Sequence, residues 1–502
     1  MATDSEDEAS AAAGPVVELE LNDLAYGGDA VGRHEGRAIF VTGGLPGELV
    51  RARLTRERAN YARAALVEVL RPSPDRVAPR YPDLAESGGF QWQHLSYPAQ
   101  LTWKTRITRQ LLIRVGHFAQ PTVRPMLGMP PGADPWRYRT VAQFAVGADG
   151  AIGFRRAASH DVLDMPACPI VHPRLDALYQ AVRAWLLARW GAEAGHYVER
   201  FTLRVAASDP TAPGVHRTPL LPGAIPPLPQ PPSVPPPATD AAHAAESGNS
   251  HAPPPGQSAG LLSLEVRPGG AFDAAGGPRA IGEELLAAVP GLAGVVTLGL
   301  PGGRGRMVVG QDYLYDRVFD RVFRISAGSF FQVNAAQTPV LVEQALLAGH
   351  ARPSDHVLDG YSGVGLFSLF FAGRAAQVTA IESQASAVAD ARASAEINHI
   401  ANVATYEGVL ERSLGSLVRR GEPVDVALVD PPRSGCHPRA LAALRDLAPR
   451  AFLYVSCDPS TLARDLHLFC VDRYRLVSVQ PVDLFPHTAH IESVALCERV
   501  RG

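Results

Sequence analysis

Apolar and polar residues alternate in short runs over residues 16–70. A period of two residues predicts strands with one buried face, and glycine pairs such as Gly27-Gly28 and Gly43-Gly44 mark turns between such strands. The runs are too short and too closely spaced for helices. We therefore expect residues 16–75 to form a small β-barrel.

Residues 80–325 combine the periods of strands and helices, which predicts an α+β central domain. Helices are expected near residues 101–117 and from residue 168 to about residue 190. Strands are expected at residues 139–146, 152–154, 201–206, 261–266 and 294–300.

Two stretches carry no such pattern. Residues 209–260 include the proline runs 235–237 and 253–255 and have almost no aliphatic residues in a regular spacing. A chain of this composition buries too little apolar surface to offset its conformational entropy, so we expect a disordered surface insertion in the central domain. The acidic, Ala- and Ser-rich residues 1–15 predict a disordered tail for the same reason.

From about residue 326 to residue 502, short apolar segments alternate with helical ones. Strands are expected at residues 356–359, 378–382, 403–406, 424–430, 452–456, 475–481 and 493–498. Strands that alternate with helices predict a doubly wound sheet. The fold class is therefore α/β, with a Rossmann-like domain that follows the barrel and the α+β central domain.

Overall charge says little about partners, because a net charge of −3 gives no general attraction to nucleic acid. A local cluster is more informative, and it consists of Arg51, Arg53, Arg56, Arg58, Tyr61 and Arg63. Arginines around an aromatic ring suit phosphate contacts combined with base stacking. A solvated, charged hairpin is the alternative interpretation of this segment.

Cysteine usage and hydropathy bear on location. The five cysteines show no paired spacing, and no apolar run is long enough to cross a membrane. With no secretory signal at the N-terminus, these features predict a cytoplasmic protein in a reducing compartment, with no membrane partner.

A glycine-rich turn, with Gly363 and Gly365, follows the first strand of the Rossmann-like part. Backbone N–H groups in such a turn can approach a ligand closely. Glu382 ends the second strand, where an acid can bind both hydroxyls of a ribose. The third glycine of a dinucleotide fingerprint is missing, so S-adenosylmethionine is favoured over NAD.

Asp430 ends another strand and is followed by two prolines, which force a rigid, non-helical exit. At this edge of an open sheet the carboxylate is expected to face the ligand crevice. A plain turn is the alternative interpretation.

Cys457 directly follows the strand at residues 452–456 and is the candidate nucleophile, because a side chain at a strand end is held rigidly beside the crevice. Residues 485–492, Phe-Pro-His-Thr-Ala-His-Ile-Glu, bring two imidazoles and a carboxylate just before the last strand, and these groups are candidates to face Cys457. No further ligands lie at metal-binding spacings, so we expect no metal site.

Two segments of the barrel resemble the TRAM domain, an RNA-binding OB-like module. They are Leu-Ala-Tyr-Gly-Gly-Asp-Ala-Val-Gly-Arg at residues 24–33 and Val-Thr-Gly-Gly-Leu-Pro-Gly-Glu at residues 41–48.

Four further motifs resemble the RNA (uracil-5-)-methyltransferase family. They are Phe-Phe-Gln-Val-Asn at 330–334, Asp-Pro-Pro-Arg-Ser-Gly at 430–435, Tyr-Val-Ser-Cys-Asp-Pro-Ser-Thr-Leu-Ala-Arg-Asp at 454–465, and the segment 485–492. The resemblance covers nearly the whole chain apart from the proline-rich insertion.

The resemblance implies a covalent mechanism. Cys457 would add to C6 of a uracil in RNA, C5 would take a methyl group from S-adenosylmethionine, and Glu492 would remove the C5 proton. Cofactor contacts would fall on Gln332, Tyr361, Gly363, Gly365, Glu382 and Asp430.

Two kinds of departure from the family stand out. Leu366 and Val409 occupy positions where relatives often carry polar residues that serve the cofactor. Many relatives also hold an iron–sulfur cluster on four cysteines, whereas Tyr81, Ser87 and Phe90 stand at three of those positions and only Cys168 remains. One thiolate cannot hold such a cluster, so we expect none.

The favoured interpretation is a monomeric 5-methyluridine methyltransferase acting on 23S ribosomal RNA, because a TRAM-like barrel is present. A uridine in the T-loop of transfer RNA is the alternative substrate. An RNA-binding or assembly factor without turnover stays open because of Leu366 and Val409. A DNA base methyltransferase would leave Cys457 and Glu492 unexplained.

Overall fold

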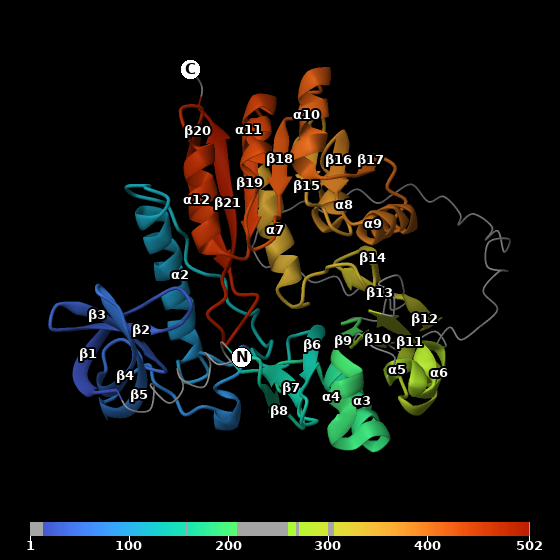
Figure 1. Ribbon diagram of the computed structural model, residues 1–502. Helices are drawn as coiled ribbons and strands as arrows, with labels where there is room; N and C mark the ends of the chain where they lie inside the picture. The colour runs from blue at the N-terminus through green and yellow to red at the C-terminus, as the bar shows by residue number, and fades with distance from the viewer. Residues whose placement is uncertain (1–13, 157–158, 208–259, 268–270, 300–305, 501–502) are drawn as a thin grey trace.

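The computed structural model describes residues 14–156, 159–207, 260–267, 271–299 and 306–500. The expected tail, apart from Gly14 and Pro15, and the expected insertion, apart from Gly260, lie outside the described residues. Figure 1 shows the barrel and the central domain side by side below the Rossmann-like domain.

The first five strands form a closed barrel in the order β1-β2-β3-β5-β4. Their bounds are Val16–Leu24 (β1), Ala30–His34 (β2), Arg37–Thr42 (β3), Leu49–Glu57 (β4) and Tyr61–Arg71 (β5). Alternate residues such as Leu19, Leu21 and Val41 are buried inside it. Between β1 and β2 both glycines have positive φ, 105° at Gly27 and 107° at Gly28, a conformation that favours glycine. The predicted barrel is confirmed.

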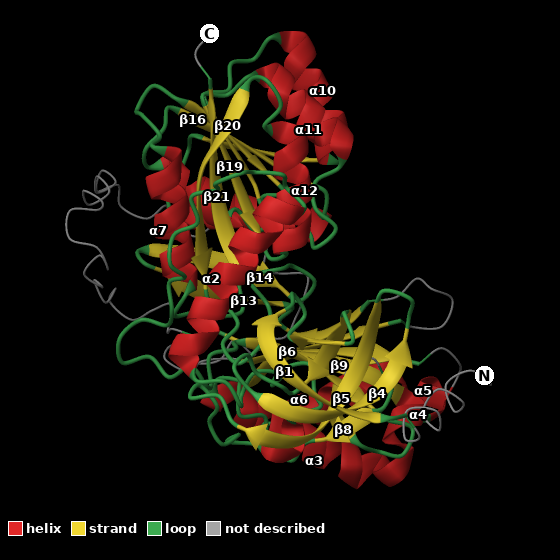
Figure 2. Ribbon diagram, turned by 90° about the vertical axis from the view of Figure 1, so that its left-hand side faces the viewer, coloured by secondary structure: helices red, strands yellow, loops and turns green. Residues whose placement is uncertain are grey.

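A long helix, α2 (Tyr97–Arg114), follows the barrel and lies against α12 (Pro459–Phe469) of the Rossmann-like domain. Figures 1 and 2 show it rising from the lower part of the molecule alongside that domain. The helix begins four residues before the predicted Leu101, because Pro98 occupies its first turn, where proline needs no intrahelical N–H bond.

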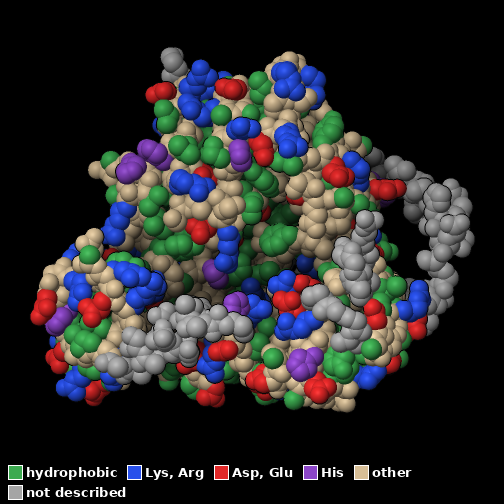
Figure 3. Space-filling model, in the orientation of Figure 1, with side chains coloured by type: hydrophobic (Ala, Val, Ile, Leu, Met, Phe, Trp, Pro, Cys, Tyr) green, Lys and Arg blue, Asp and Glu red, His purple; other side chains and the backbone are tan. Residues whose placement is uncertain are grey.

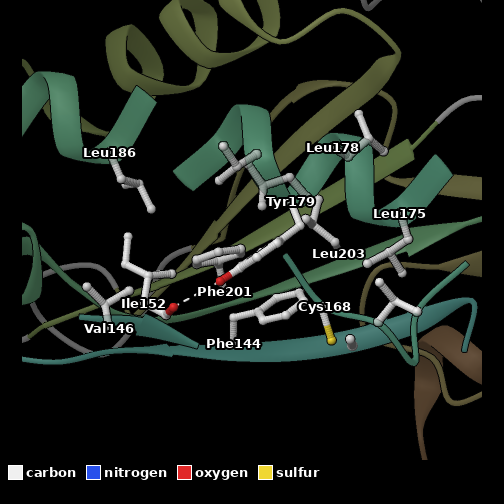
Figure 4. Packing of buried hydrophobic residues seen from close by; sticks show 14 of the residues in the cluster. Phe144, Val146, Ile152, Cys168, Leu175, Leu178, Tyr179, Leu186, Phe201 and Leu203 are labelled. Carbon is white, nitrogen blue, oxygen red and sulfur yellow. Dashed lines mark hydrogen bonds between the residues drawn. The ribbon is translucent and has the colours of Figure 1, made fainter. Parts of the chain in front are cut away.

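The central domain holds a seven-stranded sheet in the order β12-β11-β10-β9-β6-β7-β8. Its strands are β6 (Val141–Val146), β7 (Ile152–Arg155), β8 (Val162–Asp164), β9 (Val198–Val205), β10 (Gly260–Val266), β11 (Leu292–Leu298) and β12 (Met307–Gly310). Its helices are α3 (Pro173–Trp190), α4 (Ala194–Tyr197), α5 (Ala271–Ala274) and α6 (Gly277–Ala288). Figure 4 shows Tyr179 of α3 lying over Phe144 and Phe201 of the sheet, with its hydroxyl donating 2.9 Å to the carbonyl of Ile152.

The third part is a seven-stranded sheet in the order β17-β16-β15-β18-β19-β21-β20, in which β21 is antiparallel to both neighbours. The strands are β15 (His356–Gly360), β16 (Gln377–Glu382), β17 (Val403–Glu407), β18 (Val426–Val429), β19 (Ala451–Ser456), β20 (Tyr474–Val482) and β21 (Glu492–Arg499). The helices are α7 (Thr338–Gly349), α8 (Leu366–Ala372), α9 (Ala385–Ile397), α10 (Leu410–Arg420), α11 (Pro438–Leu447) and α12.

Both faces of this sheet are covered. One apolar cluster joins the sheet to α7, α8 and α9, and another joins it to α10, α11 and α12. The doubly wound, Rossmann-like sheet is thereby confirmed.

A hairpin of β13 (Tyr313–Val318) and β14 (Arg321–Ser326) precedes the Rossmann-like sheet. Its strand β14 bonds to α9, where Arg324 Nη1 lies 2.6 Å from Asp390 Oδ1 and the Arg324 N–H donates to Ser394 Oγ at 2.9 Å. The boundary between the two domains at residues 325 and 326 stays a prediction. No helix in the described part of the chain has the length and apolar character needed to span a membrane.

Candidate active site

The nucleophile and base expected from the sequence meet at one edge of the Rossmann-like sheet. In the antiparallel pairing of β19 with β21, Val455 faces Val494 and Ser456 faces Ser493. The next positions in this register are Cys457 and Glu492. Two side chains that are 35 positions apart in the chain are therefore neighbours across adjacent strand ends.

Asp430 lies on the other side of the same strand. Val429 pairs with Tyr454 in the parallel ladder of β18 and β19, so Asp430 leaves the sheet beside Val455. Burial raises the pKa of the Cys457 thiol, and the carboxylates of Glu492 and Asp430 raise it further. The structure thus brings Asp430, Cys457 and Glu492 together.

The electrostatics of this trio favour the protonated groups. Burial, together with the charge of Asp430, raises the pKa of Glu492 well above its usual range. Burial raises the pKa of Asp430 to about 8, and burial followed by the nearby carboxylates raises the pKa of Cys457 to about 12. Arg433 is the cation that opposes these shifts at Cys457 and Glu492.

The loop before Glu492 is anchored by the segments that follow the barrel. Lys104 of α2 lies 2.6 Å from Asp483, with both side chains fully buried, and donates 3.0 Å to the carbonyl of Phe485. Gln100 accepts from the N–H of His487 at 2.9 Å. These contacts fix the path of the chain into β21 and so the position of Glu492.

The two imidazoles of this loop have different places. The ring of His487 stacks on Trp136 with centroids 3.9 Å apart, and burial first, then Lys104 and Arg80, lowers its pKa to about 3. These partners of His487 therefore belong to the central domain and α2. His490 lies 3.4 Å from Arg433, and burial, then Arg433, lowers its pKa to about 4.

Gln332 is buried in a segment that Asn334 ties to the same loop. Asn334 is fully buried, and its Nδ2 donates 3.0 Å to the carbonyl of Leu484. The exposed ring of Phe330 stands two positions before Gln332. The first of the four motifs is therefore bonded to the residue immediately before the last one.

The glycine-rich turn after β15 suits a ligand that approaches the backbone. Tyr361, Gly363 and Gly365 all have positive φ, 59°, 54° and 83°. A Cβ placed on Gly363 would have no heavy atom within 4 Å, so the turn faces open space. The N–H of Gly363 donates 3.0 Å to Glu382 Oε2, which fixes the acid at the end of β16 beside the turn.

Buried polar atoms without partners surround the same turn. Ser362 Oγ and Asp359 Oδ1 have no hydrogen-bond partner among the described residues, and burial raises the pKa of Asp359 to about 7. Polar atoms of this kind normally find a partner. The hydroxyl of Ser362 and the carboxyl of Asp359 fit the hydroxyls and charged groups of S-adenosylmethionine, which would supply the missing hydrogen-bond partners.

Leu366 and Val409, the two positions at which the chain departs from the family pattern, lie in different surroundings. Leu366 begins α8 and is buried in the apolar cluster, so it serves packing. Val409 is 41% exposed as the N-cap of α10, just after the end of β17. Of these two residues, Val409 is the one that solvent or a ligand can reach at this edge of the sheet.

Aromatic side chains fill the region to which the resemblance assigns the cluster cysteines. Tyr81 packs on Trp136 with ring centroids 5.2 Å apart and on Phe90, while Ser87 is fully buried. Cys168 lies in the apolar core shown in Figure 4, and burial raises the pKa of its thiol to about 12. In the described ranges, no three His, Cys, Asp or Glu side chains come together as metal ligands.

A hollow lies between the upper and lower parts of the face seen in Figure 3, with basic and histidine side chains around it. An open pocket of about 490 Å³ is lined by Gly88, Gly89, the strands β6 and β7, Thr202 and Val333. Arg139 and Arg155 contribute guanidinium groups and Phe154 an aromatic ring. Since Val333 is next to Gln332, this pocket adjoins the segment that contains Gln332.

Sequence reasoning missed three participants. Asp359 lies next to the end of β15, and Arg433 and Tyr26 belong to motifs, so each had a positional signal. The contact of Tyr26 with Asp458 had none, because it spans 432 positions of the chain.

The fold and the strand-end site define a methyltransferase that uses S-adenosylmethionine and carries an N-terminal barrel. The TRAM domain family matches residues 12–67, and the family described as tRNA (Uracil-5-)-methyltransferase matches residues 300–409 and 420–500. An uncharacterized RNA methyltransferase of Halalkalibacterium halodurans is 33% identical over 495 residues, with 96% of this chain and 97% of that protein covered. One from Caldanaerobacter subterraneus subsp. tengcongensis is 32% identical over 501 residues, with 97% and 99% covered.

The chain belongs to the RNA (uracil-5-)-methyltransferase family, which confirms the family and the enzyme class expected from the motifs. A crystal structure of a Pyrococcus abyssi tRNA (uracil-54, C5)-methyltransferase in complex with S-adenosyl-L-homocysteine shares the fold. Its TM-score is 0.65 at 22% identity, with 96% of this chain and 99% of that one covered.

Proposed function

We propose that this enzyme methylates C5 of one uridine in 23S ribosomal RNA, with Cys457 as nucleophile and Glu492 as base. The observation that carries the proposal is the β19–β21 register, in which these two residues occupy facing positions beyond the last described pair. A nucleophile for C6 and a base for C5 must lie close together, because the two carbon atoms are bonded to each other.

The chemistry accounts for both groups. The Cys457 thiol gives its proton to solvent, an Sγ–C6 bond forms, the C5–C6 π pair becomes a C4–C5 double bond, and the C4 carbonyl π pair moves to its oxygen. The resulting enolate makes C5 nucleophilic. Burial favours the protonated form of Glu492, so its carboxyl first gives that proton to solvent. Once C5 carries the methyl group, the Glu492 carboxylate removes the C5 proton, the C5–C6 double bond re-forms, and Cys457 leaves as a thiolate.

When bound, S-adenosylmethionine supplies the methyl group for this reaction. The residues that would hold it are Gln332, Tyr361, Gly363, Gly365, Glu382 and Asp430. Support comes from the open turn at Gly363, the fixed carboxylate of Glu382 and the unpartnered polar atoms of Asp359 and Ser362.

RNA would approach through the hollow between the domains. The target base must leave its stack to reach Cys457, and the pocket with Arg139, Arg155 and Phe154 suits a neighbouring nucleotide. Action as a monomer is part of this proposal. The TRAM barrel is the ground for choosing ribosomal RNA. A tRNA T-loop uridine is the second candidate, because the Pyrococcus abyssi tRNA enzyme shares the fold over 96% of this chain and 99% of its own.

Incubation with 5-fluorouridine-substituted RNA and S-adenosylmethionine tests the proposal. Because 5-fluorouridine has no proton at C5, the final elimination is blocked. The enzyme should therefore stay covalently attached to its target and migrate with it on a denaturing gel. Separate reactions with 23S ribosomal RNA and transfer RNA, followed by sequencing of the trapped RNA, identify the substrate. The band should vanish in Cys457→Ala. An adduct that persists in this variant, or none with either RNA while the folded protein binds the cofactor, contradicts the proposal.

A further inference from the structure

The turn between β1 and β2 of the barrel reaches the catalytic edge of the distant Rossmann-like sheet. The hydroxyl of Tyr26 donates 2.7 Å to Asp458 Oδ2, and Asp458 is the residue immediately after Cys457. The turn is held from a second side, because Trp92 Nε1 donates 3.2 Å to the carbonyl of Gly28. A Cβ at Gly28 would lie 3.0 Å from Trp92 Nε1 and 3.3 Å from the Ala489 side chain, so the approach is close.

Asp458 has two separate tasks. Its Oδ1 caps α12 by accepting from the N–H groups of Ser460 at 2.9 Å and Thr461 at 3.0 Å. Its Oδ2 is the atom that accepts from Tyr26. A carboxylate next to the nucleophile is thus divided between the start of a helix and a hydroxyl from the barrel.

The charge of Asp458 works against a thiolate at Cys457. The N–H groups at the start of α12 and the hydrogen bond from Tyr26 both spread that negative charge and reduce its effect on the neighbouring sulfur. The other charged groups that face Cys457 are Glu492, Asp430 and Arg433, with His490 beside Arg433. Burial and the Asp458 carboxylate raise the pKa of the Tyr26 hydroxyl, so it keeps the proton that it donates.

We propose that Tyr26 is a positioning residue that, through its hydrogen bond to Asp458, promotes formation of the Cys457 thiolate. The nucleophile is then fully reactive only while the barrel turn lies against the catalytic edge. Because the barrel is an RNA-binding module, this contact links the seating of RNA on the barrel to the chemistry at the uracil. The link to RNA rests on the proposed function, whereas the effect on the thiol does not.

Alkylation of Cys457 by iodoacetamide, followed by peptide mass spectrometry, measures the thiolate directly and needs no RNA. Below the thiol pKa the alkylation rate is proportional to the thiolate fraction, so a pKa increase of about one unit lowers the rate about tenfold. We expect Tyr26→Phe to show a decrease of this order over the range from about pH 6 to about pH 9. Asp458→Asn removes the opposing charge and should alkylate faster than the wild type.

The double variant tests the route of the effect. If Tyr26 acts through Asp458, then Tyr26→Phe should change the rate little once Asp458 is Asn. Tyr474→Phe is the matched control, because the Tyr474 hydroxyl also donates a 2.7 Å bond, to Pro449, from the end of β20 remote from Glu492. It should alkylate like the wild type.

The rate of 5-fluorouridine adduct formation, measured as a function of RNA concentration, gives the second readout. Tyr26→Phe should lower the limiting rate and leave the RNA concentration at half-maximal rate unchanged. Equal alkylation of Tyr26→Phe and the wild type at every pH would overturn the inference, and so would an equal loss in the Asp458→Asn background. A slower alkylation in Tyr26→Phe without an adduct in any variant would uphold the effect on the thiol and refute the proposed function.

Discussion

The proposed role of Glu492 as the base can be tested by replacing one oxygen of its carboxylate with an amide nitrogen. Glu492→Gln keeps the size of the side chain and removes its ability to accept the C5 proton. We expect the addition of Cys457 and the methylation of C5 to proceed, whereas the final elimination slows by roughly 10²- to 10⁴-fold. The variant should therefore accumulate a covalent adduct with ordinary, unsubstituted RNA, which a denaturing gel detects.

Two controls sharpen this experiment. The adduct should require S-adenosylmethionine if elimination is blocked after methylation, and it should be absent in the Cys457→Ala/Glu492→Gln double variant. Rapid turnover by Glu492→Gln would show that another group removes the proton.

Asp430 makes stability depend on pH. Burial raises its pKa from 3.8 to about 8, so the folded state keeps the proton where the unfolded chain has lost it. The free energy of unfolding is therefore greatest below about pH 4 on this account and decreases as the pH rises to about 8. Asp430→Asn should remove at least about 1 kcal/mol of this decrease.

Thermal unfolding of the ligand-free protein across this pH range measures the effect. Glu498→Gln is the control, since its side chain is 41% exposed at the far end of β21 and pairs with Arg475 at the surface. A pH profile of Asp430→Asn that parallels the wild type would contradict the assignment of the raised pKa.

The sequence predicts the positions of some site residues and not of others. The places of Cys457, Glu492 and Asp430 could be predicted because each begins a strand or directly follows one, and strand ends meet at one edge. Their facing register needed the structure, because the antiparallel insertion of β21 between β19 and β20 leaves no local signal. His487 shows the converse: its place in a polar motif suggested the catalytic edge, whereas stacking on Trp136 holds it elsewhere.

At the scale of elements, α10 begins without a side-chain cap. Its N-cap is Val409, which has extended backbone angles (φ −75°, ψ 128°) but no group to bind the free N–H donors. Val409→Asp should supply that acceptor and stabilise the helix by about 0.5–2 kcal/mol. Because Val409 is exposed at the ligand edge, the same carboxylate should also tighten binding of S-adenosylmethionine.

Chemical denaturation measures the first effect and calorimetric titration with the cofactor measures the second. Val409→Ser separates them, because a serine caps the helix with a shorter, uncharged side chain. A gain in stability without a gain in cofactor affinity would show that this position does not contact the cofactor.

Periodicity predicted the strands of the Rossmann-like sheet to within about two residues, an accuracy that reflects their nearly continuous apolar runs. Helix α7 was not predicted individually because most of its residues are buried, which erases the polar face that marks a surface helix. The early start of α2 was missed because its first turn contains Pro98, a residue that more often signals a break.

The relative placement of the domains was beyond sequence reasoning, since it depends on a few contacts between distant segments. Tyr26 with Asp458 and Lys104 with Asp483 each join residues hundreds of positions apart. Such pairs leave no periodic trace in one sequence. They are nevertheless what brings the barrel and α2 to the catalytic edge.

At the scale of the whole molecule, residues 209–256 should be dispensable. The described residues on the two sides of this segment lie next to each other in space, because Val205 of β9 pairs with Gly260 of β10. Deletion of 209–256 leaves six residues, 206–208 and 257–259, between this pair. That length is ample to close an antiparallel hairpin, and a shorter loop lowers the entropy cost of closure. We expect the melting temperature and the rate of 5-fluorouridine adduct formation to stay close to those of the full chain.

As the control, deletion of residues 1–75 should abolish the Tyr26 contact and strongly reduce adduct formation. Insoluble protein, or loss of adduct formation on deletion of 209–256 alone, would show that this segment takes part in folding or in RNA binding.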